Sequence, residues 1–164
     1  MEKQTTHTGG FLTSRWKFAL YIGFFAGCIW GAVKIVEHYF KFTTVSIGFI
    51  AEPFFKHSFF DTWAGLFVGW VFFIGFSIIA AVLYMMTMWK LRSPWWGVGY
   101  GAVWWAVIYL AVGPYTGMTY WSWELGLYTN ITDFCLFLVW GMFIGYSIAI
   151  EYTDRRFTPS IHKT

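Results

Sequence analysis

Charged residues are scarce in this chain, and their scarcity excludes an ordinary soluble domain. Asp, Glu, Lys and Arg make up 12% of the 164 residues, whereas soluble domains carry about 25%. Hydrophobic residues make up 58% of the chain and aromatic residues 25%. We therefore expect lipid, rather than water, to surround most of the folded chain.

Sequence signatures of catalytic and cofactor sites are missing as well. The chain has no Walker A loop, no H-E-x-x-H, no C-x-x-C and no Gly-x-Ser-x-Gly. Cys28 and Cys135 lie inside apolar runs, where we expect small buried hydrophobes rather than a disulfide. No basic cluster is dense enough for nucleic acid. The sequence thus predicts no cofactor, no metal, no nucleic-acid partner and no enzymatic activity.

Four apolar segments are each long enough to cross a bilayer, since about 20 helical residues span about 30 Å. They cover about residues 16–36, 61–89, 95–112 and 133–150. Residues 1–14 and 154–164 are polar tails, and residues 37–60 form an apolar loop that contains Pro53. We expect this loop to lie among the lipid headgroups or on the end of the bundle. The sequence predicts an all-α integral membrane protein, a single domain whose four transmembrane helices pack as a small antiparallel bundle.

The placement of Lys and Arg predicts the orientation of the chain. Eight of these residues lie in or next to the two tails and in the connection after the second segment, and three lie on the opposite side. Basic residues prefer the cytoplasmic side of a membrane, so we expect both termini in the cytoplasm. The two groups are Lys3, Arg15, Lys17, Lys90, Arg92, Arg155, Arg156 and Lys163, against Lys34, Lys41 and Lys56.

Glycines spaced four residues apart occur in every predicted span. Small residues at this spacing allow helix backbones to approach closely, although such pairs also arise by chance in glycine-rich membrane helices. Their presence in all four spans favours a tightly packed bundle. The predicted packing residues are Gly23, Gly27 and Gly31, then Gly65 and Gly69, Gly97 and Gly101, and Gly141 and Gly145.

Two charges fall on the glycine faces of the first two spans. Lys34 continues the stripe of Gly23, Gly27 and Gly31, and Asp61 lies one turn before Gly65. Because unpaired charge is costly in a membrane, one hypothesis is a buried Lys34–Asp61 pair. The alternative is that Lys34 snorkels to the headgroups and Asp61 caps the second span.

Other polar residues gather on the predicted outer side. Histidines and carboxylates there could bind a divalent metal or transfer protons, but no metal-ligand spacing is met. Asp133 is interpreted first as a residue at the start of the fourth span. Whether this group binds anything is left open by the sequence; its members are Glu37, His38, Glu52, His57, Asp61, Glu124 and Asp133.

Several stretches carry a resemblance to a known family. They are residues 22–30 in the first span, Pro53-Phe54 and Lys56-His57 in the loop, residues 96–101 in the third span and residues 128–152 in the last. Together they resemble the YqhR family of bacterial membrane proteins. The resemblance covers nearly the whole chain in order. It implies four spans and a bacterial plasma-membrane location, and it supplies no activity.

Three classes of function are compatible with these features. The favoured one is a non-enzymatic accessory or scaffold protein, whose small-residue faces and aromatic outer loops dock another membrane protein. The alternative is a small transporter, channel or lipid-handling protein that acts as a homo-oligomer. An enzyme using the outer carboxylates and histidines is the least favoured.

Overall fold

The computed structural model describes residues 10–55, 57–88 and 93–154, and in this part of the chain all regular structure is helical. The long helices are α1 (Gly10–Tyr39), α2 (Trp63–Met88) and α5 (Leu127–Asp154). The third span is a composite of α3 (Pro94–Ala106), the π-helix η3 (Val107–Val112) and α4 (Gly113–Thr116). Two short 3-10 helices, η1 (Ile47–Ala51) and η2 (His57–Asp61), lie between α1 and α2.

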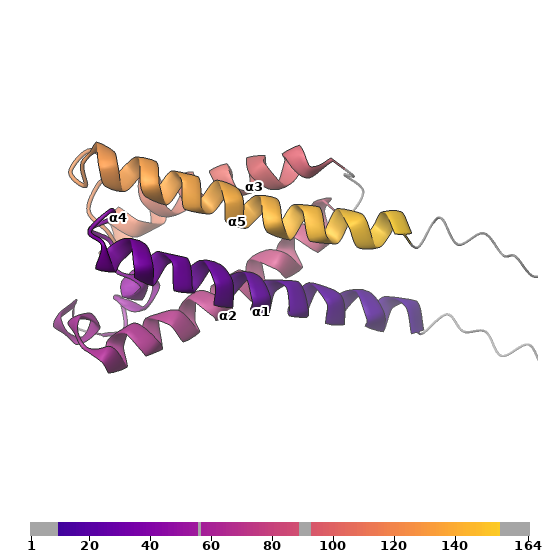
Figure 1. Ribbon diagram of the computed structural model, residues 1–164, viewed down its shortest axis with the longest axis horizontal. Coiled ribbons are helices and arrows are strands. Elements are labelled where there is room, and N and C mark those ends of the chain that lie inside the picture. Colours follow the sequence, from indigo (N-terminus) through magenta and orange to yellow (C-terminus); the bar gives the residue numbers. More distant parts are fainter. Residues whose placement is uncertain (1–9, 56, 89–92, 155–164) are drawn as a thin grey trace, which may run out of the picture.

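Four helices of the described chain are long and apolar enough to cross a membrane, which confirms the predicted fold class. They cover Trp16–Tyr39, Trp63–Met88, Trp95–Thr116 and Leu127–Ile150. The helices run antiparallel (Figure 1), so that Gly10 and Asp154 lie at one end of the bundle. We call the opposite end, formed by residues 40–55, 57–62 and 117–126, the loop end.

The bundle is built from two tightly packed helix pairs, α1 with α2 and α3 with α5. Glycine makes this packing possible, because a Cβ would collide with the neighbouring backbone. A Cβ at Gly27 would lie 2.6 Å from Ile74 Cα, and one at Gly141 would lie 2.6 Å from Gly101 Cα. The glycine faces are therefore occupied within the chain.

The predicted packing glycines do not all contact another long helix. Gly23, Gly27 and Gly31 face α2, while Gly97 and Gly101 face Gly141 and Gly145 across the second pair. Gly65 instead meets the backbone of Phe59 and Phe60, and Gly69 meets Gly48 in η1. Because these two residues of α2 have no side chain, the loop that precedes the helix can pack directly against it.

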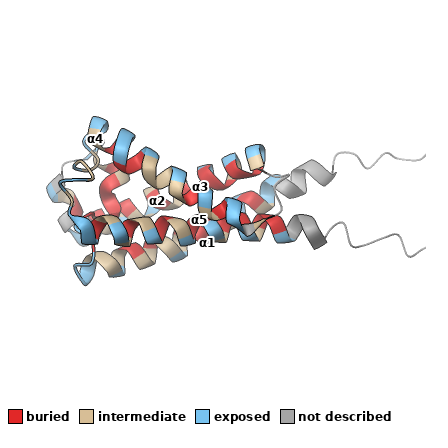
Figure 2. Cartoon of the chain, turned by 90° about the horizontal axis from the view of Figure 1, so that it is seen from above, coloured by how far each residue is buried: buried red, intermediate tan, exposed pale blue. Residues whose placement is uncertain are grey.

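Aromatic side chains fill the space between the two pairs. Trp140 stacks on Phe76 with ring centroids 5.6 Å apart, and Tyr100 meets Tyr84 edge-on at 5.0 Å. The Trp140 indole N–H donates to Ser77 Oγ at 2.9 Å, and this bond links α5 to α2. Figure 2 shows the buried residues along the inward sides of the helices. Both cysteines are free, and Cys135 is exposed rather than buried, which corrects the expectation for it.

The loop before α2 packs on the end of the bundle. Val45, Ile47, Phe49 and Phe60 are buried, whereas Phe54 is exposed. This segment therefore forms part of the core at the loop end, one of the two positions that the sequence allowed.

Two span boundaries differ from the predicted ones by four residues or more. The third helix passes through Gly113-Pro114 and reaches Thr116, because a π turn precedes the proline: the Gly113 N–H donates to the Ile108 carbonyl, five residues back. A wider turn relieves the clash that a proline ring makes with the preceding helical turn. The fourth helix begins at Leu127 after Gly126 (φ 81°), several residues before the predicted start.

Candidate functional site

A buried ion pair lies just beneath the loop end. The Lys34 ammonium on α1 contacts Asp133 Oδ1 on α5, and the two side chains are 1% and 0% exposed. A charge pair removed from water is costly unless its remaining polar atoms are satisfied. In a membrane helix such charges point to a functional or structural role.

Hydroxyl groups complete the coordination of the pair. Thr43 Oγ1 accepts from Lys34 Nζ at 3.3 Å and donates to Asp133 Oδ2 at 3.1 Å. Tyr109 donates its hydroxyl to the same carboxylate oxygen at 2.7 Å. Thr43 and Tyr109 are themselves buried. We call Lys34, Thr43, Tyr109 and Asp133 the polar clamp.

The chain reversal after α1 brings Thr43 to Lys34. Lys41 has φ 60°, a left-handed conformation that usually favours glycine. The Phe42 N–H donates to the Glu37 carbonyl and the Lys41 N–H to the His38 carbonyl, the two bonds of a Schellman motif. Helix α1 therefore ends abruptly, and the chain folds back over its last turn.

Helix α5 holds the returning chain at two successive turns. Thr129 lies one turn before Asp133 and is buried. Its hydroxyl accepts from the Thr44 N–H at 3.3 Å and lies 3.3 Å from the Thr44 hydroxyl. Neighbouring residues of the loop, Thr43 and Thr44, thus contact neighbouring turns of one helix. The π-helix supplies the remaining contact, since Tyr109 lies in it.

The structure pairs Lys34 with Asp133, a partner that the sequence did not predict. The side chain of Asp61 lies outside the described part of the chain, so the Lys34–Asp61 contact stays a prediction. Asp133 reaches Lys34 because the early start of α5 places this residue more than a turn inside the helix and against α1, rather than at the helix start. Lys34 is buried by this contact and does not snorkel.

The other polar residues predicted for the outer side do not form one group in the structure. Glu37 lies within electrostatic range of Lys34 and Asp133, and its Oε2 is buried without a hydrogen-bond partner in the described chain. The Nδ1 atom of His38 is also buried without a hydrogen-bond partner in the described chain. Glu52 and Glu124 line a separate cavity. The His57 side chain lies outside the described part.

The geometry of the clamp fits a structural connection better than a reaction centre. Both carboxylate oxygens of Asp133 are occupied by groups of the same chain, and the lysine is shielded from solvent. Among the described residues, no group of three His, Cys, Asp or Glu side chains could hold a metal ion. The clamp joins the α1/α2 pair to the α3/α5 pair at the loop end.

Sequence reasoning missed two members of the clamp. Thr43 is one of several hydroxyl residues after α1, and nothing in its immediate sequence distinguishes it. Tyr109 lies in an apolar run among ten tyrosines, and its direction depends on the π turn. Pro114, five residues after Tyr109, is the only local signal of that turn.

Comparison with known proteins assigns the chain to a family. The family model described as conserved membrane protein YqhR matches residues 3–163. The chain belongs to the YqhR family. This confirms the resemblance found in the sequence.

One relative in the family is the "Uncharacterized protein YqhR" of Bacillus subtilis (strain 168), which is 31% identical over 132 residues. The match covers 80% of this chain and 74% of the relative. No solved structure matches the chain. The family thus establishes a membrane protein and leaves its role to be inferred from the site.

Proposed function

We propose that this protein is a non-enzymatic accessory or scaffold partner of another integral membrane protein, which it contacts through aromatic side chains at its loop end. The observation that carries the proposal is a set of exposed aromatic residues in the loops of that end and at the adjoining ends of the helices, which we call the aromatic collar. Each is between 71% and 88% exposed, more than any large lipid-facing residue in the middle of the spans. The collar consists of Tyr39, Phe54, Trp63, Tyr115, Tyr120, Trp123 and Tyr128.

Aromatic residues are enriched at the centres of protein–protein interfaces, where they contribute large contact areas. They also occur as belts at the membrane surface. The polar clamp supports the docking role, because it fixes the elements that carry the collar to one another. A rigid surface loses less entropy on binding than a mobile one. The sequence proposed both the glycine faces and the aromatic loops as docking surfaces. We propose the aromatic collar alone, because the glycine faces contact other parts of the same chain.

Affinity capture at native expression level in mild detergent tests the proposal. We expect a stoichiometric membrane protein to copurify with the wild-type chain and to be lost from a Trp63→Ala/Tyr128→Ala variant. Phe67→Ala, on the exposed side of α2 one turn from Trp63, serves as the control and should retain the partner. Equal capture by all three chains would refute docking through the collar, and a clean homo-oligomer by intact mass would refute a foreign partner.

One observation favours the alternative of a small oligomeric transporter or lipid-handling protein, namely a cavity of about 500 Å³ at the loop end. Solute flux or lipid exchange in liposomes containing only this protein would support that alternative. No flux would be expected of an accessory protein.

The proposal includes the bacterial plasma membrane, with both termini in the cytoplasm. It rests on the eight-to-three distribution of Lys and Arg. A fluorescent-protein fusion after Thr164 should be fluorescent, while an alkaline phosphatase fusion at the same position should be inactive. The opposite result would reverse the orientation.

A further inference from the structure

Glu37 is a second carboxyl group beside the polar clamp. It lies on α1, one turn beyond Lys34 and toward the loop end. It interacts electrostatically with Lys34 and Asp133, and also with the Tyr109 side chain. The buried ion pair of the clamp is therefore part of a larger group that contains two carboxyl groups and one ammonium group.

The charges of this group do not balance if every member is ionised. The Lys34 ammonium supplies one positive charge, and Asp133 neutralises it by direct contact. Thr43 and Tyr109 contribute hydroxyl groups, which carry no charge. An ionised Glu37 would leave one net negative charge inside the first span, where unbalanced charge is costly. The group therefore requires either one more positive charge or a neutral Glu37.

The neighbours of Glu37 along the chain do not supply that positive charge. His38 is the next residue of α1, and consecutive residues of a helix point in different directions. Its Nδ1 atom has no hydrogen-bond partner in the described chain, and neither does Oε2 of Glu37. Lys41 lies beyond the end of α1 and is exposed. Lys34 is the remaining cation, and it is already in contact with Asp133 and Thr43.

The surroundings of the Glu37 carboxyl group favour its neutral form. Its Oε2 atom is buried, and no group of the described chain donates a hydrogen bond to it. A carboxylate oxygen without donors loses the hydration that stabilises its charge, whereas a neutral carboxylic acid costs much less to bury. The side chain as a whole is half-buried rather than sealed, so a proton can reach it from the loop end.

The contacts give the two carboxyl groups opposite roles. Two carboxyl groups that share one site rarely ionise together. Asp133 contacts the Lys34 ammonium and accepts hydrogen bonds from the hydroxyl groups of Thr43 and Tyr109, and these contacts stabilise its ionised form. The buried oxygen of Glu37 accepts no hydrogen bond in the described chain. Asp133 is therefore the counter-ion, and Glu37 is the group that is left to hold a proton.

We propose that Glu37 is a proton-binding site, a neutral carboxylic acid that exchanges its proton at the loop end while Asp133 stays ionised against Lys34. Loss of this proton would place a second carboxylate beside the same ammonium group, in competition with Asp133. The polar clamp would then respond to the pH on that side of the membrane. The proposal is independent of the docking partner proposed above.

Infrared spectroscopy detects such a proton directly, because the C=O stretch of a carboxylic acid is separate from the bands of a carboxylate. The full chain is studied in dodecyl maltoside, a detergent without a carbonyl group. At neutral pH the wild type should show a carboxylic acid band that shifts in D₂O and is missing from Glu37→Gln. A spectrum without this band, or a band that remains in Glu37→Gln, would overturn the proposal.

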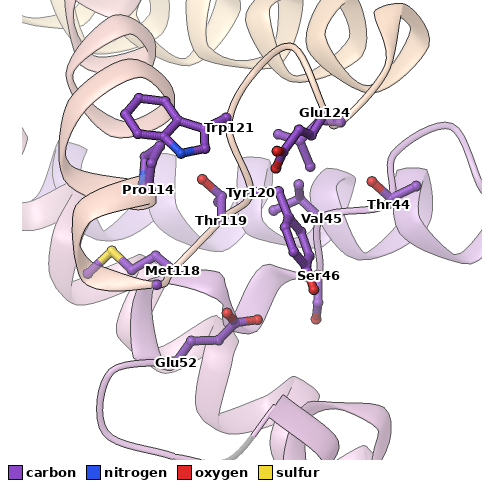
Figure 3. Close-up of a pocket in the computed structure, with 12 residues that line it drawn as sticks. Thr44, Val45, Ser46, Glu52, Pro114, Met118, Thr119, Tyr120, Trp121 and Glu124 are labelled. Carbon is purple, nitrogen blue, oxygen red and sulfur yellow. The ribbon is translucent and has the colours of Figure 1, made fainter.

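Glu124→Gln is the matched control for this experiment. Glu124 is an exposed carboxyl group at the same end of the bundle, in the wall of the separate cavity that Figure 3 shows. The infrared band should remain in this variant. Loss of the band from Glu124→Gln as well as from Glu37→Gln would overturn the assignment of the proton to Glu37.

Thermal unfolding separates a proton-binding role from a purely structural one. Glutamine has the size and the neutrality of a protonated glutamate, so Glu37→Gln should unfold at the wild-type temperature at neutral pH. As the pH rises, the wild type should lose stability relative to Glu37→Gln, because its folded chain would hold one proton more than its unfolded chain. Glu124→Gln should follow the wild type. Destabilisation of Glu37→Gln at neutral pH, or a difference that does not change with pH, would overturn the proposal.

A sodium ion is the competing occupant, because it too would balance the charge of an ionised Glu37. Replacing sodium with tetramethylammonium at constant ionic strength distinguishes the two. We expect the infrared band and the unfolding temperature of the wild type to be the same in both salts. A higher unfolding temperature in sodium, without a carboxylic acid band, would replace the proton site by a sodium site.

Discussion

Replacing Asp133 with Asn removes the counter-charge of Lys34 while keeping the size of the side chain. The lysine is 1% exposed, and its other hydrogen-bond partner, Thr43, is neutral. Breaking a buried ion pair by removing one member costs about 3–5 kcal/mol, against about 0–1 kcal/mol for a surface pair. We expect Asp133→Asn to lower the free energy of unfolding by about 3 kcal/mol, since Lys34 lies near the loop end and can regain some hydration by moving toward the headgroups.

The reverse change, Lys34→Met, should cost a similar amount, because it leaves a buried carboxylate with only hydroxyl donors. The double variant Lys34→Met/Asp133→Leu removes both charges. It should cost no more than either single variant, about 3 kcal/mol, rather than their sum, because the charges are gone but the buried Thr43 and Tyr109 hydroxyls lose their acceptor. The coupling energy of the cycle therefore separates a true buried pair from two unrelated defects.

Equilibrium unfolding in mixed micelles, with increasing dodecyl sulfate and far-ultraviolet circular dichroism, measures these free energies. Lys17→Met is the control, because Lys17 is an exposed lysine on the same helix. The control should change the free energy by about 0.5 kcal/mol or less. If either single variant behaved like the control, or if the double variant lost the sum of the two single losses, the reasoning about the clamp would be refuted.

Three further predictions use the same unfolding measurement. Gly141→Ala should lower the free energy of unfolding by about 1–3 kcal/mol, because its Cβ would lie 2.6 Å from Gly101 Cα. Gly99→Ala is the control and should be neutral or stabilising, because no atom lies within 4 Å of its Cβ. Equal losses in the two variants would contradict close helix packing. Tyr109→Phe should cost about 1.5–3 kcal/mol, the range for a hydrogen bond to a charged group, and no loss would mean that this bond is unimportant. Lys41→Gly should stabilise by up to about 1 kcal/mol, because φ is 60° there; destabilisation would show that the lysine side chain contributes more than the backbone strain costs.

The number and location of the membrane helices followed from the length of the apolar runs, because a bilayer sets a minimum length for each span. The ends of the helices were less predictable. Residues 127–132 contain Thr and Asn and read as loop, yet they are helical in the structure. Because that turn was missing from the prediction, Asp133 was placed at the edge of the membrane instead of inside the bundle.

The partner of Lys34 could not be predicted for a related reason. The sequence indicated which face of α1 carries the lysine, but it did not indicate which helix lies against that face at that depth. Helical periodicity orients a side chain about one axis only. Whether Asp133 reaches Lys34 depends on the register of α5 against α1. The direction of the Tyr109 side chain depends on a π turn, which the periodicity of the hydrophobic residues does not indicate.

The separation of Lys34 and Asp133 in sequence has a consequence for biosynthesis. The lysine is made 99 residues before its counter-ion, and that counter-ion lies on α5, the last of the four described spans. Until α5 is made, the first three helices must therefore accommodate an ammonium group that lacks the Asp133 carboxylate. A chain truncated before α5 would keep this ammonium group in the membrane without the Asp133 carboxylate, so the ion pair can form only after α5 has joined the other helices.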